Sequence, residues 1–418
     1  MMMRLNRLAF LLNRFFASNN RLLQPRCCVT LLSLIYLVIS VGLLIYTVNT
    51  PSHARKFVEK DAQHYIAIGR AMASGDFSMN YVKQRPYRQP LYPTLLSVVI
   101  RFGGENLFLF GMVNVTLGLI IIWLVYFSSL ELFGNNAIAC VIGFLAVMNR
   151  FSYERVSVSL GTEPLFVLLL FLVVLWFGSY ISQGNSKNLV LASTAAGFAY
   201  LTRPNGLFIM PAIIGLAGFY DIFRRRRNAP SPSRLVPIGR LAILYASCAA
   251  LFLIITLPST LPRWRIWGNP IEHGVIENFM WVDDYNVGKQ PTVRYTWRDY
   301  VATHTPLDVV WRWLRGFWAV YVRVPLWEEV WAILYLIAVP GVIIAVLRRQ
   351  EPYRYLLLLA FILLLPLVWI HVADPTGRIP YSVMFPFEFI FAGLALDSLR
   401  ARLNEPPTKS QQATNHPL

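Results

Sequence analysis

Residues 164–181 read PLFVLLLFLVVLWFGSYI, a run without a single charged side chain. A transmembrane helix needs about 20 mostly apolar residues to cross the hydrocarbon core of a bilayer, so this run predicts a membrane span. Of all 418 residues, 56% are hydrophobic and 14% are charged, whereas about 25% of a soluble domain is charged. The composition therefore excludes a soluble globular protein, and the high hydrophobicity excludes a disordered chain.

Ten apolar segments follow one another along the chain, which predicts an all-α integral membrane fold with about ten transmembrane helices. They are residues 29–48, 106–128, 137–151, 164–181, 188–202, 206–222, 241–258, 330–347, 355–370 and 380–397. The organisation predicted from them is a basic N-terminal segment over 1–28, a transmembrane domain over 29–397 and a tail over 398–418. The tail is rich in Pro, Gln and Thr, so we expect it to be disordered.

Short arginine-rich segments predict the orientation, because Lys and Arg accumulate in cytoplasmic loops. These segments are residues 1–26, 224–240, 348–354 and 400–402. Ten crossings from a cytosolic N-terminus place all four segments, and both termini, in the cytosol. Two long loops, 49–105 and 259–329, then face the opposite side. This bias accounts for much of the net charge of +17, and we expect no nucleic-acid partner.

Eight of the twelve tryptophans lie in the second long loop, 259–329, and indole rings prefer the membrane–water interface. Within it, residues 307–323 predict an amphipathic helix, because apolar side chains recur at helical spacing. Arg312, Arg315 and Arg323 lie between them. We expect this helix to lie along the membrane surface with its arginines near lipid phosphates. A helix that only anchors the loop is the alternative.

Cysteines and acidic clusters offer little sign of a metal site. The four cysteines are Cys27, Cys28, Cys140 and Cys248. None belongs to a C-x-x-C or Cys/His spacing, so we expect neither a disulfide framework nor a zinc site. Asp283 and Asp284, with Glu272 and Glu277 upstream, could offer oxygens to a divalent cation, although no ligand spacing repeats.

The first long loop carries a candidate catalytic carboxylate. After Asp61, the residues Tyr65, Ile68 and Met72 recur at steps of three or four, which predicts a helix that begins at Asp61. Asp61 could simply cap this helix. Alternatively, a carboxylate at the water–lipid boundary could accept a proton from an incoming hydroxyl group.

Cationic side chains near the outer ends of the spans are candidates for a phosphate site, because Arg binds phosphate through paired donors. They are Arg85, Arg88, Arg203, Arg263, Arg265 and Arg378. Pairing with nearby acids, or a rigid lead-in to a helix at Arg85 and Arg88, is the structural alternative. Glu163 lies where the chain re-enters the membrane. It could bind a hydroxyl, orient an arginine, or simply favour the start of a helix.

The order of several short motifs resembles the GT-C superfamily of membrane glycosyltransferases. The motifs are Asp61-x-x-x-Tyr65, Pro90-Leu91-Tyr92-Pro93, Gly161-Thr162-Glu163-Pro164-Leu165, Leu201-Thr202-Arg203-Pro204-Asn205-Gly206 and Gly377-Arg378-Ile379-Pro380-Tyr381. The resemblance implies a helical bundle whose first outer loop is partly re-entrant. It also implies transfer of a sugar from a polyprenyl-phosphate carrier to an acceptor on the non-cytosolic face.

Residue by residue, the resemblance places Asp61 at the catalytic acidic position, with Tyr65 and the arginines as substrate-binding candidates. Protein O-mannosyltransferases carry adjacent acids there, whereas Ala62 follows Asp61 in this chain and Glu59 is the nearest companion. The chain is thus more similar to the branch related to lipid A aminoarabinose transferases, which favours a bacterial inner membrane. The acceptor could be a lipid, a glycan or a protein.

Chemistry at the outer face points the same way. A donor anchored in the bilayer has a phosphate leaving group at headgroup depth, where fixed arginines would stabilise the growing charge. A carboxylate could serve as base, and attack opposite the phosphate inverts the anomeric centre. A transporter or flippase of lipid-linked sugars is one rival, but transporters place polar groups near the bilayer midplane. A non-catalytic envelope assembly protein is the other.

Overall fold

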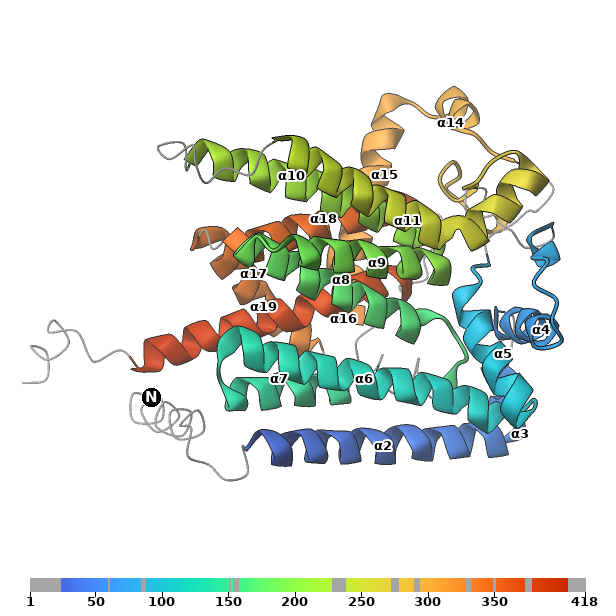
Figure 1. Ribbon diagram of the computed structural model, residues 1–418, viewed down its shortest axis with the longest axis horizontal. Helices are drawn as coiled ribbons and strands as arrows, with labels where there is room; N and C mark the ends of the chain where they lie inside the picture. The colour runs from blue at the N-terminus through green and yellow to red at the C-terminus, as the bar shows by residue number, and fades with distance from the viewer. Residues whose placement is uncertain are drawn as a thin grey trace, which may run out of the picture.

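The computed structural model describes residues 24–58, 61–83, 88–149, 152, 158–227, 238–271, 278–288, 294–327, 332–348, 351–372 and 378–404. Throughout these residues every regular element is a helix, as the composition predicted. Figure 1 shows most of the helices lying side by side along the long axis of the molecule.

Seven helices are long and apolar enough to cross a membrane. They lie in α2 (Pro25–Asn49), α6 (Leu107–Phe133), α8 (Glu163–Gln183), η4 (Pro204–Phe208) continuing into α10 (Ile209–Arg227), α11 (Ile238–Trp267), α18 (Glu351–Ile370) and α19 (Arg378–Asn404). The prediction of a helical protein with multiple spans is therefore confirmed.

The remaining three predicted spans are also helices, but shorter ones. They are α7 (Asn136–Met148), α9 (Ser186–Thr202) and α17 (Ile333–Leu347). At 1.5 Å per residue, the 13 residues of α7 and the 15 of α17 reach about 20–23 Å, less than the hydrocarbon thickness of about 30 Å. Seven helices, rather than the ten expected, thus have the length and apolarity of a span within the described residues.

The most buried span is α19, with 83% of its apolar window inside the protein. It packs against α17, α18, α8 and α7. The approach of α17 is especially close, because a Cβ on Gly341 would lie 1.8 Å from the carbonyl oxygen of Phe391. Only glycine allows two helix backbones to come together in this way.

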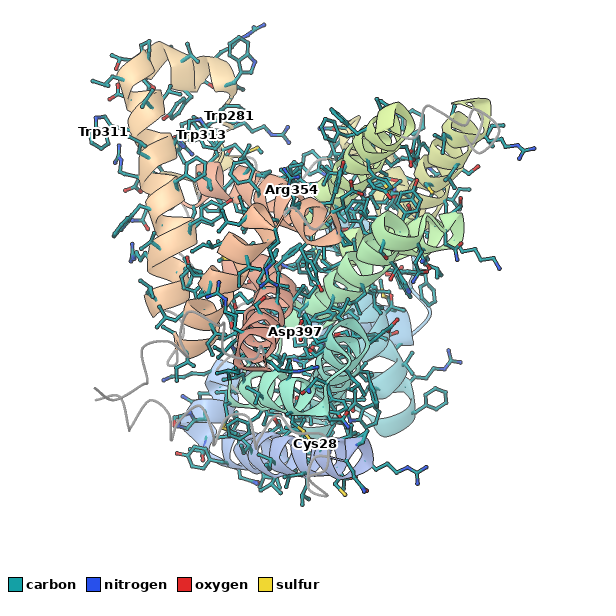
Figure 2. All side chains as sticks on the ribbon, turned by 90° about the vertical axis from the view of Figure 1, so that its left-hand side faces the viewer. Cys28, Trp281, Trp311, Trp313, Arg354 and Asp397 are labelled. Atoms are coloured by element: carbon teal, nitrogen blue, oxygen red, sulfur yellow. A yellow bond between two sulfur atoms is a disulfide. The ribbon has the colours of Figure 1, made fainter. Side chains whose placement is uncertain are left out.

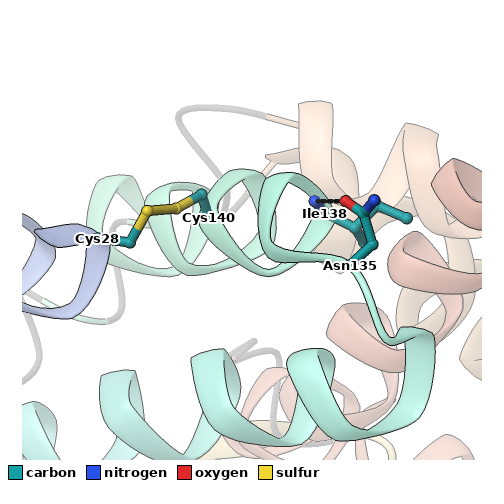
Figure 3. The surroundings of a disulfide bond; sticks show 4 residues. All are labelled: Cys28, Asn135, Ile138 and Cys140. Carbon is teal, nitrogen blue, oxygen red and sulfur yellow. Dashed lines mark hydrogen bonds between the residues drawn. A yellow bond between two sulfur atoms is a disulfide. The ribbon is translucent and has the colours of Figure 1, made fainter. Parts of the chain in front are cut away.

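A disulfide joins α2 to α7 through Cys28 and Cys140 (Figure 3). The expectation that the chain would form no disulfide was therefore wrong. The two cysteines are 112 residues apart, and only the packing of α2 against α7 brings them together, so short-range spacing gave no sign of the pair. The same figure shows Asn135 capping α7, with its Oδ1 accepting a hydrogen bond from the Ile138 amide at 3.0 Å.

The two ends of the bundle differ in the segments that they carry. The helices α3 (Pro51–Phe57), α4 (Asp61–Ala73) and α5 (Leu91–Gly103) gather at one end, on the right of Figure 1. The beginning of α2, the end of α10 and the end of α19 lie at the opposite end. The helix ends next to the basic segments are thus far from the first long loop, as the orientation argument requires.

The predicted amphipathic helix begins at Pro306 as α15 (Pro306–Trp318) and continues through η6 (Ala319–Arg323) into α16 (Val324–Trp327). It runs crosswise to most of the bundle in Figures 1 and 2, and α14 (Trp297–Thr303) precedes it. Figure 2 shows Trp311 on its outer side and Trp313 facing the bundle. Arg312, expected near lipid phosphates, is instead fully buried, because it lies on the face that packs against α18.

Candidate functional site

The centre of the candidate site is an ion pair between Asp61 and Arg88. Asp61 is the first residue of α4, and Arg88 lies just before α5. The Arg88 Nη2 atom contacts Asp61 Oδ1 and lies 3.2 Å from His64 Nδ1. Its Nη1 atom donates to the Tyr65 hydroxyl at 2.9 Å. The Asp61 carboxylate, the His64 ring and the Tyr65 hydroxyl thus lie within about one turn of α4. All three contact the Arg88 guanidinium.

Exposure differs sharply between the two partners. The Arg88 side chain is 8% exposed, whereas that of Asp61 is 36% exposed. The guanidinium carbon also lies 4.9 Å from the centre of the Tyr65 ring, a geometry that stabilises a cation. The arginine is therefore fixed inside the protein, and the carboxylate is held at the surface, where another molecule can reach it.

The last turns of α11 support this pair from the other side. Ser259, Arg263 and Trp267 are four residues apart, so they share one face of the helix. Arg263 is fully buried; its Nη2 donates to the backbone oxygen of Arg88 at 3.0 Å, and its Nη1 donates to the Ser259 backbone oxygen at 2.6 Å. The Ser259 hydroxyl donates to Gln89 Oε1 at 2.5 Å. Consecutive residues before α5 are thus tied to α11.

Behind the ion pair, Tyr92 links the site to the core of the bundle. Its ring meets the Tyr65 ring edge to face at 5.5 Å, and its hydroxyl donates to Asn114 Oδ1 at 2.9 Å. The Asn114 amide in turn donates to the backbone oxygen of Ser159 at 3.4 Å. Burial raises the pKa of Tyr92 far above its usual value, so its hydroxyl stays a neutral donor.

A second ion pair joins Glu163 at the start of α8 to Arg203 at the end of α9, at 2.9 Å. The side chains are 7% and 12% exposed. The Glu163 charge also acts on the buried Tyr92 hydroxyl, which places the pair near the layer behind Asp61. Mutual pairing lowers the cost of holding these charges at a membrane boundary.

The structure therefore brings four of the predicted site residues into one network, with Glu163 and Arg203 beside it. The four are Asp61, Tyr65, Arg88 and Arg263. Arg265 is exposed and lies outside these contacts. Arg85 and the side chain of Arg378 lie outside the described residues.

Sequence reasoning missed four contributors: His64, Gln89, Ser259 and Asn114. Two signals could have found some of them. Ser259 and Arg263 have the i, i+4 spacing of residues that meet on a helix, and His64 lies one residue before Tyr65 in the motif itself. Nothing local marks Gln89 or Asn114, because their partners come from distant helices.

The acidic pair of the second long loop has a different environment. Asp283 contacts Arg312 at 2.6 Å and His304 at 3.4 Å, so its carboxylate is engaged by nitrogen groups. Glu272 and Glu277, the other cation-ligand candidates, lie outside the described residues. Among the residues that the structure does describe, no three His, Cys, Asp or Glu side chains are grouped as metal ligands.

Comparison with known proteins adds the family. Residues 84–260 match the family of dolichyl-phosphate-mannose-protein mannosyltransferases. The matched stretch runs from just before α5 into the last turns of α11 and contains Arg88, Glu163 and Arg203. The comparisons with curated proteins and with solved structures found no match.

The helical membrane fold and this match indicate the class, a membrane glycosyltransferase. The match is to a domain of the dolichyl-phosphate-mannose-protein mannosyltransferase family, a GT-C family, and it covers residues 84–260 of the 418. The resemblance to the GT-C superfamily that the motifs suggested is thereby confirmed.

Proposed function

We propose that this protein is an inverting glycosyltransferase that moves a sugar from a polyprenyl-phosphate carrier to an acceptor hydroxyl on the non-cytosolic face of the membrane. The observation that carries the proposal is the position of Asp61. Its carboxylate is partly exposed at one end of the bundle, on a chain of the glycosyltransferase class, while a buried arginine fixes its orientation. A general base needs both access to substrate and a fixed geometry.

The bond changes follow from that assignment. The acceptor oxygen attacks the anomeric carbon while its proton passes to the Asp61 carboxylate. The bond from the anomeric carbon to the phosphate oxygen breaks, and the leaving polyprenyl phosphate keeps the electron pair. Attack from the face opposite the phosphate inverts the anomeric centre. A carboxylate base of this kind contributes on the order of 10²–10⁴-fold in rate.

Fixed cations complete the site, since the departing phosphate gains charge in the transition state. Arg88 supplies a positive charge next to Asp61. Arg263 is engaged with backbone and Ser259 oxygens, so we assign it the role of positioning Arg88. Arg85, Arg265 and Arg378 are proposed to reach the donor phosphate from the surrounding loops. Arg203, paired with Glu163, is proposed to bind sugar hydroxyls or the phosphate together with that acid.

We also propose that α7, α9 and α17 complete a set of ten crossings, with both termini in the cytosol. The basic segments adjoin helix ends opposite α4 and α5, which supports this orientation. Maleimide labelling of variants with one added cysteine tests it, in a Cys27→Ser background where Cys28 and Cys140 are disulfide-bonded and Cys248 is buried. Ser74→Cys, just after α4, should react from the outside of intact cells, and Ser182→Cys, in the last turn of α8, should react only after permeabilisation. The reverse pattern would overturn both the topology and the outward-facing site.

The activity test uses membranes that contain the protein and a labelled polyprenyl-phosphate sugar. The wild type should transfer label to an acceptor and release polyprenyl phosphate. Asp61→Asn should abolish transfer at unchanged abundance. The matched control is Glu105→Gln, which likewise replaces a carboxylate by an amide. Glu105 is exposed, lies just after α5 and pairs with Arg70 of α4, so this variant should retain full activity.

Three outcomes would contradict the proposal. Full transfer by Asp61→Asn would remove the base assignment. Movement of intact lipid-linked sugar between leaflets, without release of polyprenyl phosphate, would favour the flippase alternative. A protein with neither activity would fit the assembly role.

A further inference from the structure

A small cavity adjoins the candidate site along the same helix. It has a volume of about 190 Å³ and is lined on one side by Ala67, Ile68, Ala71 and Met72 of α4. The other side is lined by residues that follow α4 in the chain, namely Asp76, Met79, Asn80 and Tyr81. One water occupies about 30 Å³ in the liquid, and a cavity of about 150 Å³ holds a benzene ring. The space therefore fits one six-membered ring.

The lining combines an apolar floor with polar groups, as small-molecule sites do. Ile68, Met72 and Met79 are buried, and Asp76 and Asn80 are exposed at the rim. The Asp76 carboxylate accepts a hydrogen bond from the Ser78 amide at 2.9 Å, and the Asn80 amide donates to the Ser78 hydroxyl at 2.7 Å. A carboxylate and a side-chain carbonyl are both acceptors for hydroxyl groups.

Tyr81 lines the cavity, but its hydroxyl does not face it. The hydroxyl is buried out of reach of solvent, and the charge of Arg263 acts on it. The hydroxyl therefore lies on the side of Arg263, and we take the ring of Tyr81 as part of the apolar lining.

The backbone at the cavity is strained and held in place. Met79 has φ of 59°, and it is the only non-glycine residue with a positive φ in the part of the chain that is described. Such strain persists where the surroundings enforce it, and it is common at binding sites. The next turn is fixed by Trp267 of α11, whose indole donates to the backbone oxygen of Val82 at 3.3 Å. The segment that follows α4 is therefore held in place as one wall of the cavity.

Position along α4 indicates which part of a substrate the cavity would hold. Ile68 and Met72 follow Asp61 and Tyr65 on one helix face, and Ile68 lies about 10 Å from Asp61 along the axis at 1.5 Å per residue. The reacting hydroxyl must lie within about 3 Å of the base, so it cannot lie inside the cavity. The donor sugar reacts at the carbon bonded to its phosphate and must be near Asp61 as well. The cavity is thus suited to a ring one unit away from the reacting one.

We propose that this cavity is an acceptor subsite for a pyranose ring, and that the acceptor is a glycan of at least two sugar units. The inference rests on the proposed glycosyl transfer. The apolar floor would contact the C–H face of the ring, and Asp76 and Asn80 would bind its hydroxyl groups. The neighbouring sugar would then present its hydroxyl to Asp61.

A protection experiment on the purified full-length protein tests the subsite without turnover. In the Cys27→Ser background, Ala71→Cys places a thiol in the cavity wall, and Ser74→Cys places one on the exposed surface nearby. The probes are methyl glycosides of glucose, mannose, galactose and N-acetylglucosamine, together with the matching disaccharides. At least one disaccharide should slow maleimide labelling at position 71 and leave position 74 unchanged.

Asp76→Asn, added to Ala71→Cys, separates a ligand contact from a structural role. It keeps an oxygen that can accept from the Ser78 amide but replaces the carboxylate, so thermal stability should hold, whereas the protecting sugar should bind about two- to tenfold more weakly. The proposal is overturned if no sugar protects position 71, if both positions are protected equally, or if only the polyprenyl-phosphate sugar protects. Because protection needs no catalysis, activity of Asp61→Asn would refute the base and leave this result standing.

Discussion

Two parts of this protein place a buried arginine against a partly exposed aspartate and an aromatic ring. In the first long loop Arg88 meets Asp61 over the Tyr65 ring. In the second, Arg312 meets Asp283 with its guanidinium carbon 4.8 Å from the Tyr300 ring and 4.4 Å from the Trp369 ring. Composition and charge would not distinguish the two.

The difference lies in what else each guanidinium binds. Arg312 donates to the backbone oxygens of Trp369 at 3.2 Å and Phe279 at 2.9 Å, so it fastens the loop and α15 to the end of α18. The Arg88 guanidinium instead contacts the side chains of Asp61, His64 and Tyr65 on α4. Backbone partners indicate a structural role for Arg312, whereas the contacts of Arg88 hold the partly exposed Asp61 carboxylate where a substrate can reach it.

The largest effect on stability is expected at Arg312. Arg312→Met leaves Asp283 and two carbonyls without their donor, and breaking a buried pair costs about 3–5 kcal/mol. Thermal unfolding of the purified protein should show a large fall in Tm. Arg298→Met, at an arginine over the Trp297 ring, is the matched control and should change Tm little. An unaltered Tm for Arg312→Met would show that the second loop is not fastened by this residue.

The largest effect on activity, after loss of the base itself, is expected at Arg88. Arg88→Met removes the cation that orients Asp61, and loss of one preorganised donor lowers kcat by about 10²–10³-fold. The transfer assay should show this loss per folded molecule, whereas Arg312→Met should retain activity in whatever fraction stays folded. Equal activity losses in both variants would erase the distinction drawn between the two arginines.

A smaller effect is expected at Tyr65. Tyr65→Phe keeps the ring beneath Arg88 but removes the hydroxyl that accepts its hydrogen bond at 2.9 Å. A lost hydrogen bond of this kind corresponds to about 1 kcal/mol, so kcat/KM should fall several-fold. Tyr300→Phe, at the equivalent ring beside Arg312, should leave kcat/KM unchanged. A Tyr65→Phe variant with wild-type kinetics would mean that the Tyr65 hydroxyl does not help to position the guanidinium.

The smallest effect concerns the helix cap that begins α15. Thr305 and Asp308 form a capping box, and the hydrogen bonds from Thr305 lower the pKa of Asp308 below its usual value. A carboxyl whose pKa is lower in the folded state stabilises the protein above its unfolded pKa and loses this effect as the pH falls through the folded pKa. Thr305→Ala should cost about 1 kcal/mol near neutral pH.

The pH dependence checks the same cap. Tm of the wild type should fall as the pH drops below about 4, and Thr305→Ala should show a smaller fall, since it has already lost the hydroxyl partner of Asp308. Thr303→Ala, outside the cap, is the control and should follow the wild type. Parallel curves for Thr305→Ala and wild type would mean that the cap does not contribute.

Much of the helical organisation could be predicted from the sequence, because apolar runs and helical periods are local signals. The helix from Asp61 and the amphipathic helix from Pro306 both appear where the periods placed them. The number of long spans was overestimated by three, because α7, α9 and α17 are only 13, 17 and 15 residues long. The Cys28–Cys140 disulfide could not be predicted, because it depends on two helices packing side by side.

The candidate site was predictable by residue type but not by role. Asp61, Arg88 and Tyr65, three candidates from the first long loop, lie in contact, although their roles stay predictions. The direction of a side chain, however, depends on tertiary packing. Arg263 and Arg312 were both expected at phosphates, and both point into the protein because backbone carbonyls of distant segments lie there.

The unequal burial of α11 has a consequence for how the enzyme responds to its surroundings. Only 17% of the apolar window of this helix is covered by protein, and side chains such as Leu253 and Ile254 face outward. Its last turns nevertheless hold Gln89, Arg88 and Val82. Bilayers of different thickness change the tilt of lipid-exposed helices. A change in the tilt of α11 would shift the residues that it holds next to Asp61, so we expect reconstituted activity to vary with the acyl-chain length of the lipid.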